Sequence, residues 1–397
     1  MVDARWLLCV FLVTSCQDQR ASTPPAGTRD SAGVEIVETG TPVWKSTSKW
    51  TVDAEPFVSI GEADGDDPYL FSRIVGVVRR TDGTIVVADG GARELREFDS
   101  TGRFLSSKGR RGPGPAEFGS LHRMARCGSS EIWVDAGSRI SIWSITLEYL
   151  REFTVPNSIM WPLVCFGGTG LLVKRDIGVR GSDFGGEREP PRNTIFFDSL
   201  HLMVRDSMGR SRRDLMDIPL RAYVHVAKGG TLYGISHPFG RSTLLAPDGP
   251  NLVIGYAERL EVNTYSRAGV LLRIARGPSE DLTLGAVWRR EFEKAALVGP
   301  AKDARELLKI AGDPMPSTIP AYSALKIDRD GNIWVKRFAL PGHSTDRWGV
   351  FDRDGRFLGH VAVPAGLDVY EIGPDYVLGS ETDSLDVPRV RGYRLHR

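Results

Sequence analysis

One segment of this chain is repeated almost letter for letter far along the sequence. Residues 98–105 read Phe-Asp-Ser-Thr-Gly-Arg-Phe-Leu, and residues 351–358 read Phe-Asp-Arg-Asp-Gly-Arg-Phe-Leu. Each copy follows two apolar stretches that flank an Asp-Gly pair, at residues 82–83 and 330–331. Asp-Gly supplies the positive φ angles that tight hairpin turns need. Each copy therefore predicts four short antiparallel strands in about 40 residues, which is the size of one propeller blade.

Weaker copies of the same hairpin fill the rest of the chain. The six predicted inner hairpins lie at residues 77–87, 124–134, 163–173, 224–235, 325–335 and 369–378. The last copy ends three strands into its blade, and an unused strand-like stretch at 50–60 precedes the first copy. Because ring closure removes exposed strand edges, we expect this N-terminal strand to complete the last blade. The predicted fold is all-β, a six-bladed β-propeller of four-stranded blades.

The matching glycines of the two strong copies, Gly102 and Gly355, lie farther apart than four blades require. Two insertions account for the excess. Residues 176–196 are polar and rich in Gly and Pro, which predicts a long loop. Residues 279–312 change to a helical period, which predicts a small helical insertion. The propeller itself is assigned to residues 46–397.

A short apolar run at residues 6–13 follows Arg5 and predicts a signal peptide, because it is too short to span a bilayer. Residues 13–16 read Val-Thr-Ser-Cys and resemble the lipobox of bacterial lipoproteins, in which the cysteine is lipidated. We expect residues 1–16 to be a lipoprotein signal peptide with Cys16 as the lipidation site. An ordinary cleaved signal and an uncleaved anchor are the alternatives. Gln17 implies, by the same resemblance, sorting to the outer membrane.

Residues 17–45 begin with a polar stretch rich in Pro, Ser, Thr and Gly, which predicts a flexible tether. The whole chain has 51 basic and 50 acidic residues, a formal net charge of +1. This balance gives no electrostatic reason to expect a nucleic-acid partner. We expect a monomer that contacts the membrane through its lipid anchor.

Several of these motifs resemble NHL-type six-bladed β-propellers. Blades of that family read as an apolar strand, Asp-Gly-Asn, Ile-Tyr-Val-Ala-Asp and Phe-Asp-x-x-Gly-x-Phe. Here residues 330–335 read Asp-Gly-Asn-Ile-Trp-Val and residues 85–89 read Ile-Val-Val-Ala-Asp, while the Gly-rich stretch 109–118 is similar to the link between NHL blades. The chain is also similar to uncharacterised propeller lipoproteins of the bacterial envelope. The resemblance implies a fold, and a fold does not by itself determine a function.

The enzyme alternative within this architecture is a metal-dependent hydrolase or lyase with its site in the central channel, as the resemblance to propeller lactonases implies. A hard divalent cation needs oxygen ligands from several inner strands. Asp, Glu and Asn are absent from four predicted inner strands, at residues 73–80, 122–127, 161–166 and 223–228. The acids that remain are Asp328, Asp368 and Glu371. We therefore expect no metal site and no cofactor, and favour a binding or scaffold protein that contacts protein, peptide or glycan.

Histidines give no stronger case for a metal. Only His122 and His225 lie on predicted inner strands, and a catalytic zinc has three protein ligands. Two cysteines remain after the signal peptide, Cys127 and Cys165, each predicted at the end of an inner strand in neighbouring blades. A disulfide in the oxidising envelope and two buried free thiols are equally compatible with this placement.

A ligand, if one binds, is expected at the mouth of the channel, because concave sites with a few polar groups are the usual binding sites. Residues at the starts of the predicted inner strands would line this mouth, namely Arg73, His122, Trp161, Tyr223 and Tyr322. Aromatic and cationic side chains there suit a peptide or a sugar. Aromatic residues at strand starts also serve as ordinary packing between blades, and this alternative stays open.

Overall fold

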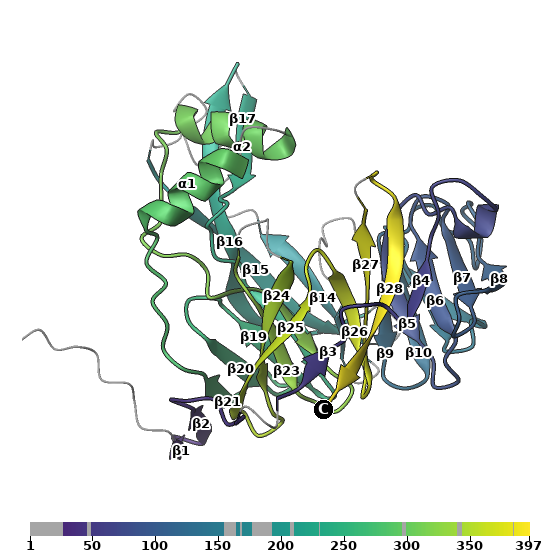
Figure 1. Cartoon of the computed structure of the whole chain (residues 1–397), viewed down its shortest axis with the longest axis horizontal. Coiled ribbons are helices and arrows are strands. Elements are labelled where there is room, and N and C mark those ends of the chain that lie inside the picture. Colours follow the sequence, from purple (N-terminus) through teal and green to yellow (C-terminus); the bar gives the residue numbers. More distant parts are fainter. Residues whose placement is uncertain are drawn as a thin grey trace, which may run out of the picture.

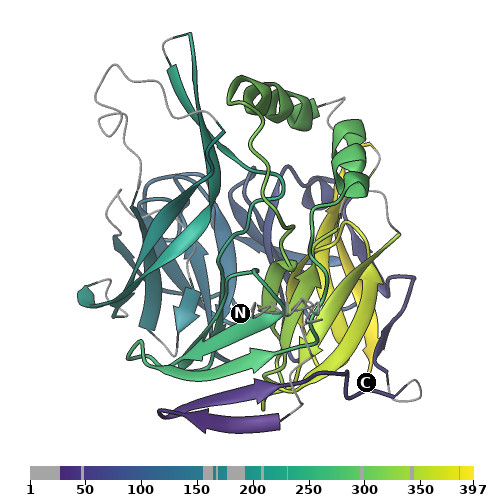
Figure 2. The same ribbon diagram turned by 90° about the vertical axis from the view of Figure 1, so that its left-hand side faces the viewer.

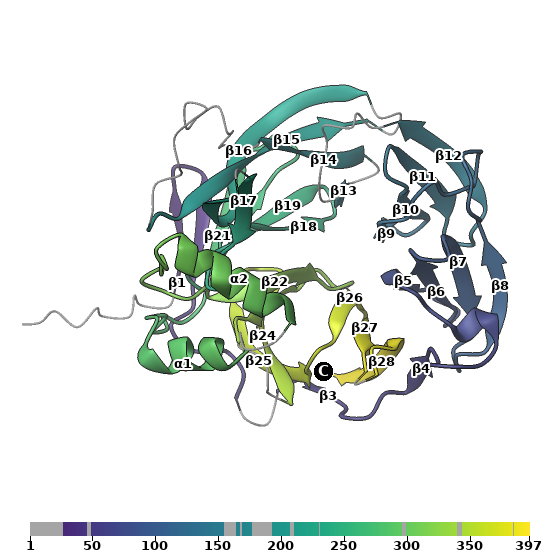
Figure 3. The same ribbon diagram turned by 90° about the horizontal axis from the view of Figure 1, so that it is seen from above.

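The computed structural model describes residues 27–45, 49–154, 164–166, 169–176, 193–206, 210–229, 231–295, 299–339, 344–383 and 385–397. The strands of these residues form six sheets that stand in a ring around a central axis (Figure 3). Within each sheet the chain begins at the axis and steps outward. The predicted all-β propeller is confirmed. No helix in these ranges is long and apolar enough to cross a membrane.

The first two sheets are antiparallel and have four strands each. The first sheet consists of β5 (Ile74–Arg79), β6 (Ile85–Asp89), β7 (Glu94–Phe98) and β8 (Phe104–Lys108). A short 3-10 helix, η1 (Asp67–Tyr69), precedes it. The second sheet consists of β9 (Arg123–Cys127), β10 (Glu131–Asp135), β11 (Arg139–Ser144) and β12 (Tyr149–Thr154).

The third and fourth sheets are larger. The third consists of β13 (Val164–Phe166), β14 (Thr169–Asp176), β15 (Phe196–Arg205), β16 (Ser211–Lys228) and β17 (Thr231–Ser236). The fourth consists of β18 (Leu244–Asp248), β19 (Asn251–Gly255), β20 (Glu261–Tyr265) and β21 (Leu271–Arg276), extended at its outer edge by β2 (Val34–Glu38) and β1 (Gly27–Ser31).

The last two sheets close the ring. The fifth consists of β22 (Tyr322–Ile327), β23 (Ile333–Arg337), β24 (Thr345–Phe351) and β25 (Phe357–Pro364). The sixth consists of β26 (Asp368–Ile372), β27 (Tyr376–Thr382), β28 (Pro388–His396), β3 (Thr51–Val52) and β4 (Val58–Ile60). Both N-terminal strands, β3 and β4, pair antiparallel with β28. The predicted completion of the last blade by the N-terminal stretch is therefore confirmed.

One kind of turn joins the third and fourth strands of five sheets, and it explains the sequence repeat. Asp99 in the first sheet and Asp352 in the fifth accept the backbone N–H groups two and four residues further on, at 2.8 to 3.0 Å. Ser144 and Ser266 accept the equivalent bonds in the second and fourth sheets, at 3.0 to 3.2 Å. Asp206 accepts the bond from the residue four positions on in the third sheet, at 3.0 Å.

The fourth predicted inner hairpin, at residues 224–235, is wrong. These residues form the outer pair β16–β17 of the third sheet, while β18–β19 is the inner hairpin of the fourth. The β18–β19 turn also contains an Asp-Gly pair, at residues 248–249, with Gly249 at a φ of 54°. The apolar character of Val224 and Val226 has a different cause, since both are buried against the helical insertion.

The helical insertion consists of α1 (Ala286–Ala295) and α2 (Gly299–Ile310), as predicted for residues 279–312. The helices pack on β16–β17 in one apolar cluster that includes Val224, Phe239, Phe292 and Leu308. Figure 1 shows the helices and this hairpin rising together from one face of the ring, while the C-terminus lies at the other face. We call the first of these the helix face. Because the segment after α2 leads directly into β22, this inner strand begins at the helix face.

The predicted flexible tether of residues 17–45 is wrong for residues 27–38, which form the hairpin β1–β2. β2 pairs in parallel with β21, and Figure 2 shows the hairpin along the outer edge of the fourth sheet. Ile36 and Val37 are buried there. Burial of these two apolar side chains stabilises the docked hairpin, although the neighbouring residues are polar. Cys16 and residues 177–192 of the predicted long loop lie outside the described residues.

Candidate functional site

The inner strands surround a central channel of about 1340 Å³. The charged side chains on its wall are Arg73, Arg123, Arg126, Lys326, Arg329, Arg353, Asp248, Asp328, Asp330, Asp368 and Glu371. No residue of α1 or α2 belongs to the wall as far as the structure describes it, so the helices stand beside the mouth. We divide the wall into two halves. The helix-face half consists of Arg73, His122, Arg123, Lys326, Asp368 and Tyr370, and the turn half consists of Arg126, Asp248, Asp328, Arg329, Asp330, Arg353 and Glu371. The backbone of Lys326 lies near the turn end of β22, and the residue is counted in the helix-face half because its amine lies near Asp368 and Arg123.

Glu371 in the turn half lies between two arginines. Its carboxylate forms ion pairs of 3.1 Å with Arg126 and with Arg329. Both guanidinium groups also donate to the backbone oxygen of Arg79, at 2.6 and 2.7 Å. The hydroxyl of Tyr376 donates to Glu371, and burial together with this carboxylate raises the pKa of Tyr376 above its usual range. The acid that sequence analysis identified here is thus part of a satisfied network that ties three inner strands together.

Asp328 in the turn half is also fully occupied. It accepts hydrogen bonds from Asn332 Nδ2 at 2.8 Å and from the indole of Trp334 at 3.0 Å. The guanidinium of the C-terminal Arg397 pairs with Asp328 at 2.8 Å and with Asp330 at 2.6 Å. These bonds tie the C-terminus to the β22–β23 turn. The role of Asp328 in the structure is therefore to hold this turn and the chain end in place.

The helix-face half has a different balance of charge. Arg73 donates from its guanidinium to the backbone oxygens of Leu121 and Gly90, at 3.1 and 3.5 Å. Tyr370 donates to the backbone oxygen of Ile74 at 3.1 Å. Burial, followed by the charge of Asp368, raises the pKa of Tyr370 to about 12. The carboxylate of Asp368 is the acid on this part of the wall.

Two further cations face Asp368 across the helix-face half. Burial lowers the pKa of Lys326, while Asp368 opposes the shift and Arg123 adds to it. Burial also lowers the pKa of Arg123, and Asp135, Tyr370 and Asp368 oppose that shift. Lys326 and Arg123 are therefore close enough to repel each other, and Asp368 attracts both, while Asp135 of β10 also attracts Arg123.

The five predicted mouth residues have different positions. Arg73 and His122 lie on the wall of the channel at the helix face, and their role in binding stays a prediction. Tyr322 is a correction, because it is buried between the fourth and fifth sheets and donates to the backbone oxygen of Glu261 at 2.6 Å. Its role is packing between sheets, which is the alternative that the sequence analysis gave for aromatic residues at strand starts. Trp161 lies outside the described residues.

Tyr223 is a second correction. It lies on β16, whose register partners are in β15 and β17, and not on an inner strand. Its ring is buried and lies 5.5 Å from the guanidinium of Arg221. The physical reason is that an apolar–glycine–apolar pattern describes inner and outer hairpins equally well.

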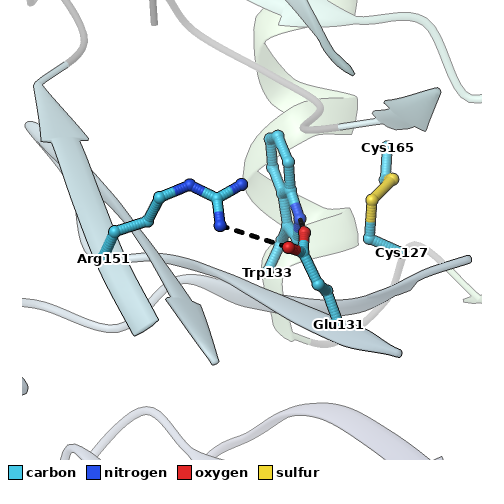
Figure 4. The surroundings of a disulfide bond; sticks show 5 residues. All are labelled: Cys127, Glu131, Trp133, Arg151 and Cys165. Atoms are coloured by element: carbon cyan, nitrogen blue, oxygen red, sulfur yellow. Dashed lines mark hydrogen bonds and ion pairs between the residues drawn. A yellow bond between two sulfur atoms is a disulfide. The ribbon is translucent and has the colours of Figure 1, made fainter. Parts of the chain in front are cut away.

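Cys127 and Cys165 form a disulfide between β9 and β13, with their Cα atoms 5.3 Å apart (Figure 4). It therefore joins the inner strands of the second and third sheets, where Cys165 contributes to the channel wall. Trp133 lies beside the bond, and its indole donates to Glu131 at 2.8 Å. Arg151 pairs with the same carboxylate at 3.1 Å.

Sequence analysis missed Arg123, Lys326 and Asp248 as wall residues. Lys326 and Asp248 are the charged residues of their inner strands, and Arg123 lies beside Arg126 on β9, so a charge on an inner strand was the available signal. Asp248 was also hidden by the misplaced fourth hairpin. Burial raises the pKa of Asp248, while Arg273 and Arg353 oppose the shift.

Within the residues that the structure describes, no group of three or more His, Cys, Asp or Glu side chains could hold a metal ion. The acids of the wall are spread over three inner strands and the turns after them. The described side chains of the wall can therefore supply separate charges at fixed positions around an open space.

No family model matches the chain, and no curated protein matches it. Among solved structures, a member of the duf4221 family from Bacteroides vulgatus matches with a TM-score of 0.50 and 10% identity, over 88% of this chain and 99% of that one. A candidate exported protein from Bacteroides fragilis matches with a TM-score of 0.49 and 14% identity, over 91% and 99%. A catalytically inactive virginiamycin B lyase from Staphylococcus aureus matches with a TM-score of 0.41 and 10% identity, over 88% and 99%. At such identities the likeness concerns the fold alone.

Proposed function

We propose that this protein is a non-enzymatic binding or scaffold propeller of the bacterial cell envelope, which receives protein, peptide or glycan at the channel mouth on the helix face. The observation that carries the proposal is the channel, whose volume of about 1340 Å³ is open beside the helices. A concave space with polar groups at fixed positions is the usual form of a binding site. The Asp-Gly and Phe-Asp motifs support an assignment of the blades to the NHL type.

The acids of the turn half favour binding over metal chemistry. Glu371 is held by two arginines and Asp328 by Arg397 and two uncharged donors. A carboxylate that is already hydrogen-bonded in this way would have to give up its partners to hold a cation. In our proposal these groups keep the wall rigid, and the helix-face half contacts the ligand.

Export supports the envelope as the location. The apolar run at residues 6–13 and the sequence before Cys16 fit a lipoprotein signal peptide. The disulfide between Cys127 and Cys165 fits an oxidising compartment outside the cytoplasm. We therefore propose a monomer anchored by lipid on Cys16, at the outer membrane.

Metal content and turnover distinguish this proposal from a metal-dependent hydrolase or lyase in the channel. Purified mature protein is analysed for divalent metals and assayed against a panel of lactones and esters. Our proposal predicts no stoichiometric metal and no turnover above that of buffer. Stoichiometric metal together with turnover that is lost on chelation would overturn it.

The anchor is tested separately by mass spectrometry of the mature N-terminus and by the Cys16→Ser variant. The proposal predicts a lipid-modified chain that begins at Cys16 and a variant that leaves the membrane fraction. An unmodified chain that begins at another residue would remove the anchor and leave the binding function in place.

A further inference from the structure

The two halves of the channel differ in how their charges are balanced. In the turn half the wall has three arginines and four carboxylates, and Glu371 pairs with both Arg126 and Arg329. In the helix-face half the wall has three cations, Arg73, Arg123 and Lys326, and one carboxylate, Asp368. Asp135 approaches Arg123 from β10, but it is not part of the wall. The excess of positive charge is therefore confined to the half at the helix-face mouth.

Lys326 is the member of this group that most needs a counter-ion. The residue is half-buried on β22, and over the described ranges no hydrogen bond and no ion pair within 4.0 Å holds its ammonium group. Within the described residues, the charged amine is paired with no counter-ion of the chain and faces the channel. The nearby guanidinium of Arg123 disfavours its positive charge further. A charged group from outside the chain could supply what this part of the wall lacks.

We propose that the helix-face half of the channel binds an oxyanion, a carboxylate or phosphate group of the ligand, between Lys326 and Arg123. This inference rests on the proposed function, since it names the chemistry of the ligand that the channel receives. An oxyanion fits because ammonium and guanidinium groups both donate charge-assisted hydrogen bonds to its oxygens. Asp368 limits the affinity, because it already neutralises part of the positive charge.

Binding of an anion should depend on the charge of Lys326. In the free protein burial lowers the pKa of Lys326. The groups around it are Arg123 and His122 next to each other on the chain, Arg73 before β5, and Asp368 on β26. A bound anion favours the charged amine and raises this pKa again. Affinity should therefore fall as pH rises through the pKa of the occupied state.

The experiment is calorimetric titration of the mature protein with matched probes. Galacturonate and galactose have the same ring and differ in a carboxylate, and inorganic phosphate tests the other oxyanion. Each titration is repeated at several pH values, from neutral to alkaline. We expect galacturonate or phosphate to bind at least about tenfold more tightly than galactose, and the affinity for the anion to fall towards alkaline pH. The more tightly bound of the two anions identifies the source of the oxyanion.

Three variants separate a role in binding from a role in folding. Lys326→Met should weaken anion binding about tenfold and reduce the loss of affinity at alkaline pH, while Asp368→Asn should strengthen binding. Lys108→Met removes an exposed lysine from the outer strand β8 and should change neither. Circular dichroism and the unfolding midpoint confirm that each variant is folded before it is titrated.

The outcomes are distinct. Equal binding of galacturonate and galactose, no binding of either anion, or a Lys326→Met variant that binds like the wild type would each overturn the anion site. None of these results would support an enzymatic function or contradict the proposed binding function. Metal-dependent turnover of a lactone or an ester would instead overturn the proposed function, whatever the anion titrations show.

Discussion

Asp99 shows how a single side chain specifies the outer turn of a blade. Its carboxylate accepts bonds from the hydroxyl and the backbone N–H of Thr101 and from the backbone N–H of Arg103. These bonds, that of the Thr101 side chain foremost, lower its pKa to about 2 from 3.8. Ser144 and Ser266 accept the same backbone bonds in other sheets without a titrating group. The turn therefore needs an acceptor at this position and not a charge.

We predict different acid stabilities for Asp99→Ser and Asp99→Ala. Because the folded state depresses the pKa of Asp99, its contribution is fully present above pH 4 and is lost as pH falls towards 2. Asp99→Ser should keep most of the free energy of unfolding at pH 7 and lose this part of its pH dependence. Asp99→Ala should lose this pH dependence and also be less stable than wild type at pH 7. Urea unfolding between pH 7 and pH 2 measures them, and a serine variant that keeps the wild-type acid profile would contradict the prediction.

The same residues show what could be predicted at this scale. The two Phe-Asp copies were visible because Asp and Gly recur with the same neighbours. The copies at Ser144 and Ser266 were missed because serine replaces aspartate, and Leu147 even replaces the turn glycine, with a φ of 58°. Lys326 was missed for another reason. Its importance comes from the absence of a partner among the described residues around it, and a linear sequence does not show this.

Among the elements, the disulfide joins two inner strands that pair with different sheets. Cys127 ends β9 of the second sheet and Cys165 lies on β13 of the third. A bond between neighbouring blades restricts the unfolded chain and also fixes the distance between the blades at the channel.

We predict that replacing both cysteines by alanine lowers the free energy of unfolding by about 4 kcal/mol, the value that loop-closure entropy gives for a separation of 38 residues. Urea unfolding of the variant and of the wild type measures this difference. Reduction of the wild type should produce the same loss. If a reducing agent leaves the midpoint of the wild type unchanged, the bond is absent in solution.

The packing of strand β2 on the fourth sheet leads to a second prediction about an element. Val37 is buried between β21 and the fifth sheet, with a side-chain carbon near Gly355. Val37→Asp should cost about 2 to 4 kcal/mol, because it places a carboxylate in an apolar contact. Thr28→Asp in the exposed strand β1 is the matched control and should cost less than about 0.5 kcal/mol. Equal midpoints for the two variants in thermal unfolding would show that the hairpin is not docked.

The misplaced fourth hairpin illustrates the limit of local patterns. Residues 224–235 and 244–255 both read as apolar, glycine turn, apolar. The first pair lies on the third sheet because β16 extends over 18 residues and reaches the helices beyond the ring. Only the position of the insertion distinguishes an inner from an outer hairpin here, and that position is a tertiary property.

For the molecule as a whole, the sequence was sufficient for the ring and its closure. The last copy of the repeat ends after three strands, so its blade needs a further strand from another part of the chain. β3 and β4 complete this blade by pairing with β28. The parallel addition of β2 to β21 was not predictable, since it joins residues about 240 positions apart through a short apolar run. The unequal charge of the two channel halves is likewise a property of the closed ring.

In our proposal a partner enters the channel through the helix-face mouth. The most direct measurement is photocrosslinking in cells that export the protein, with a benzophenone side chain in place of His122. Lys108, on the outer strand β8, is the control position. We expect a specific adduct from position 122 and none from position 108. No adduct from position 122, or equal adducts from both positions, would contradict it.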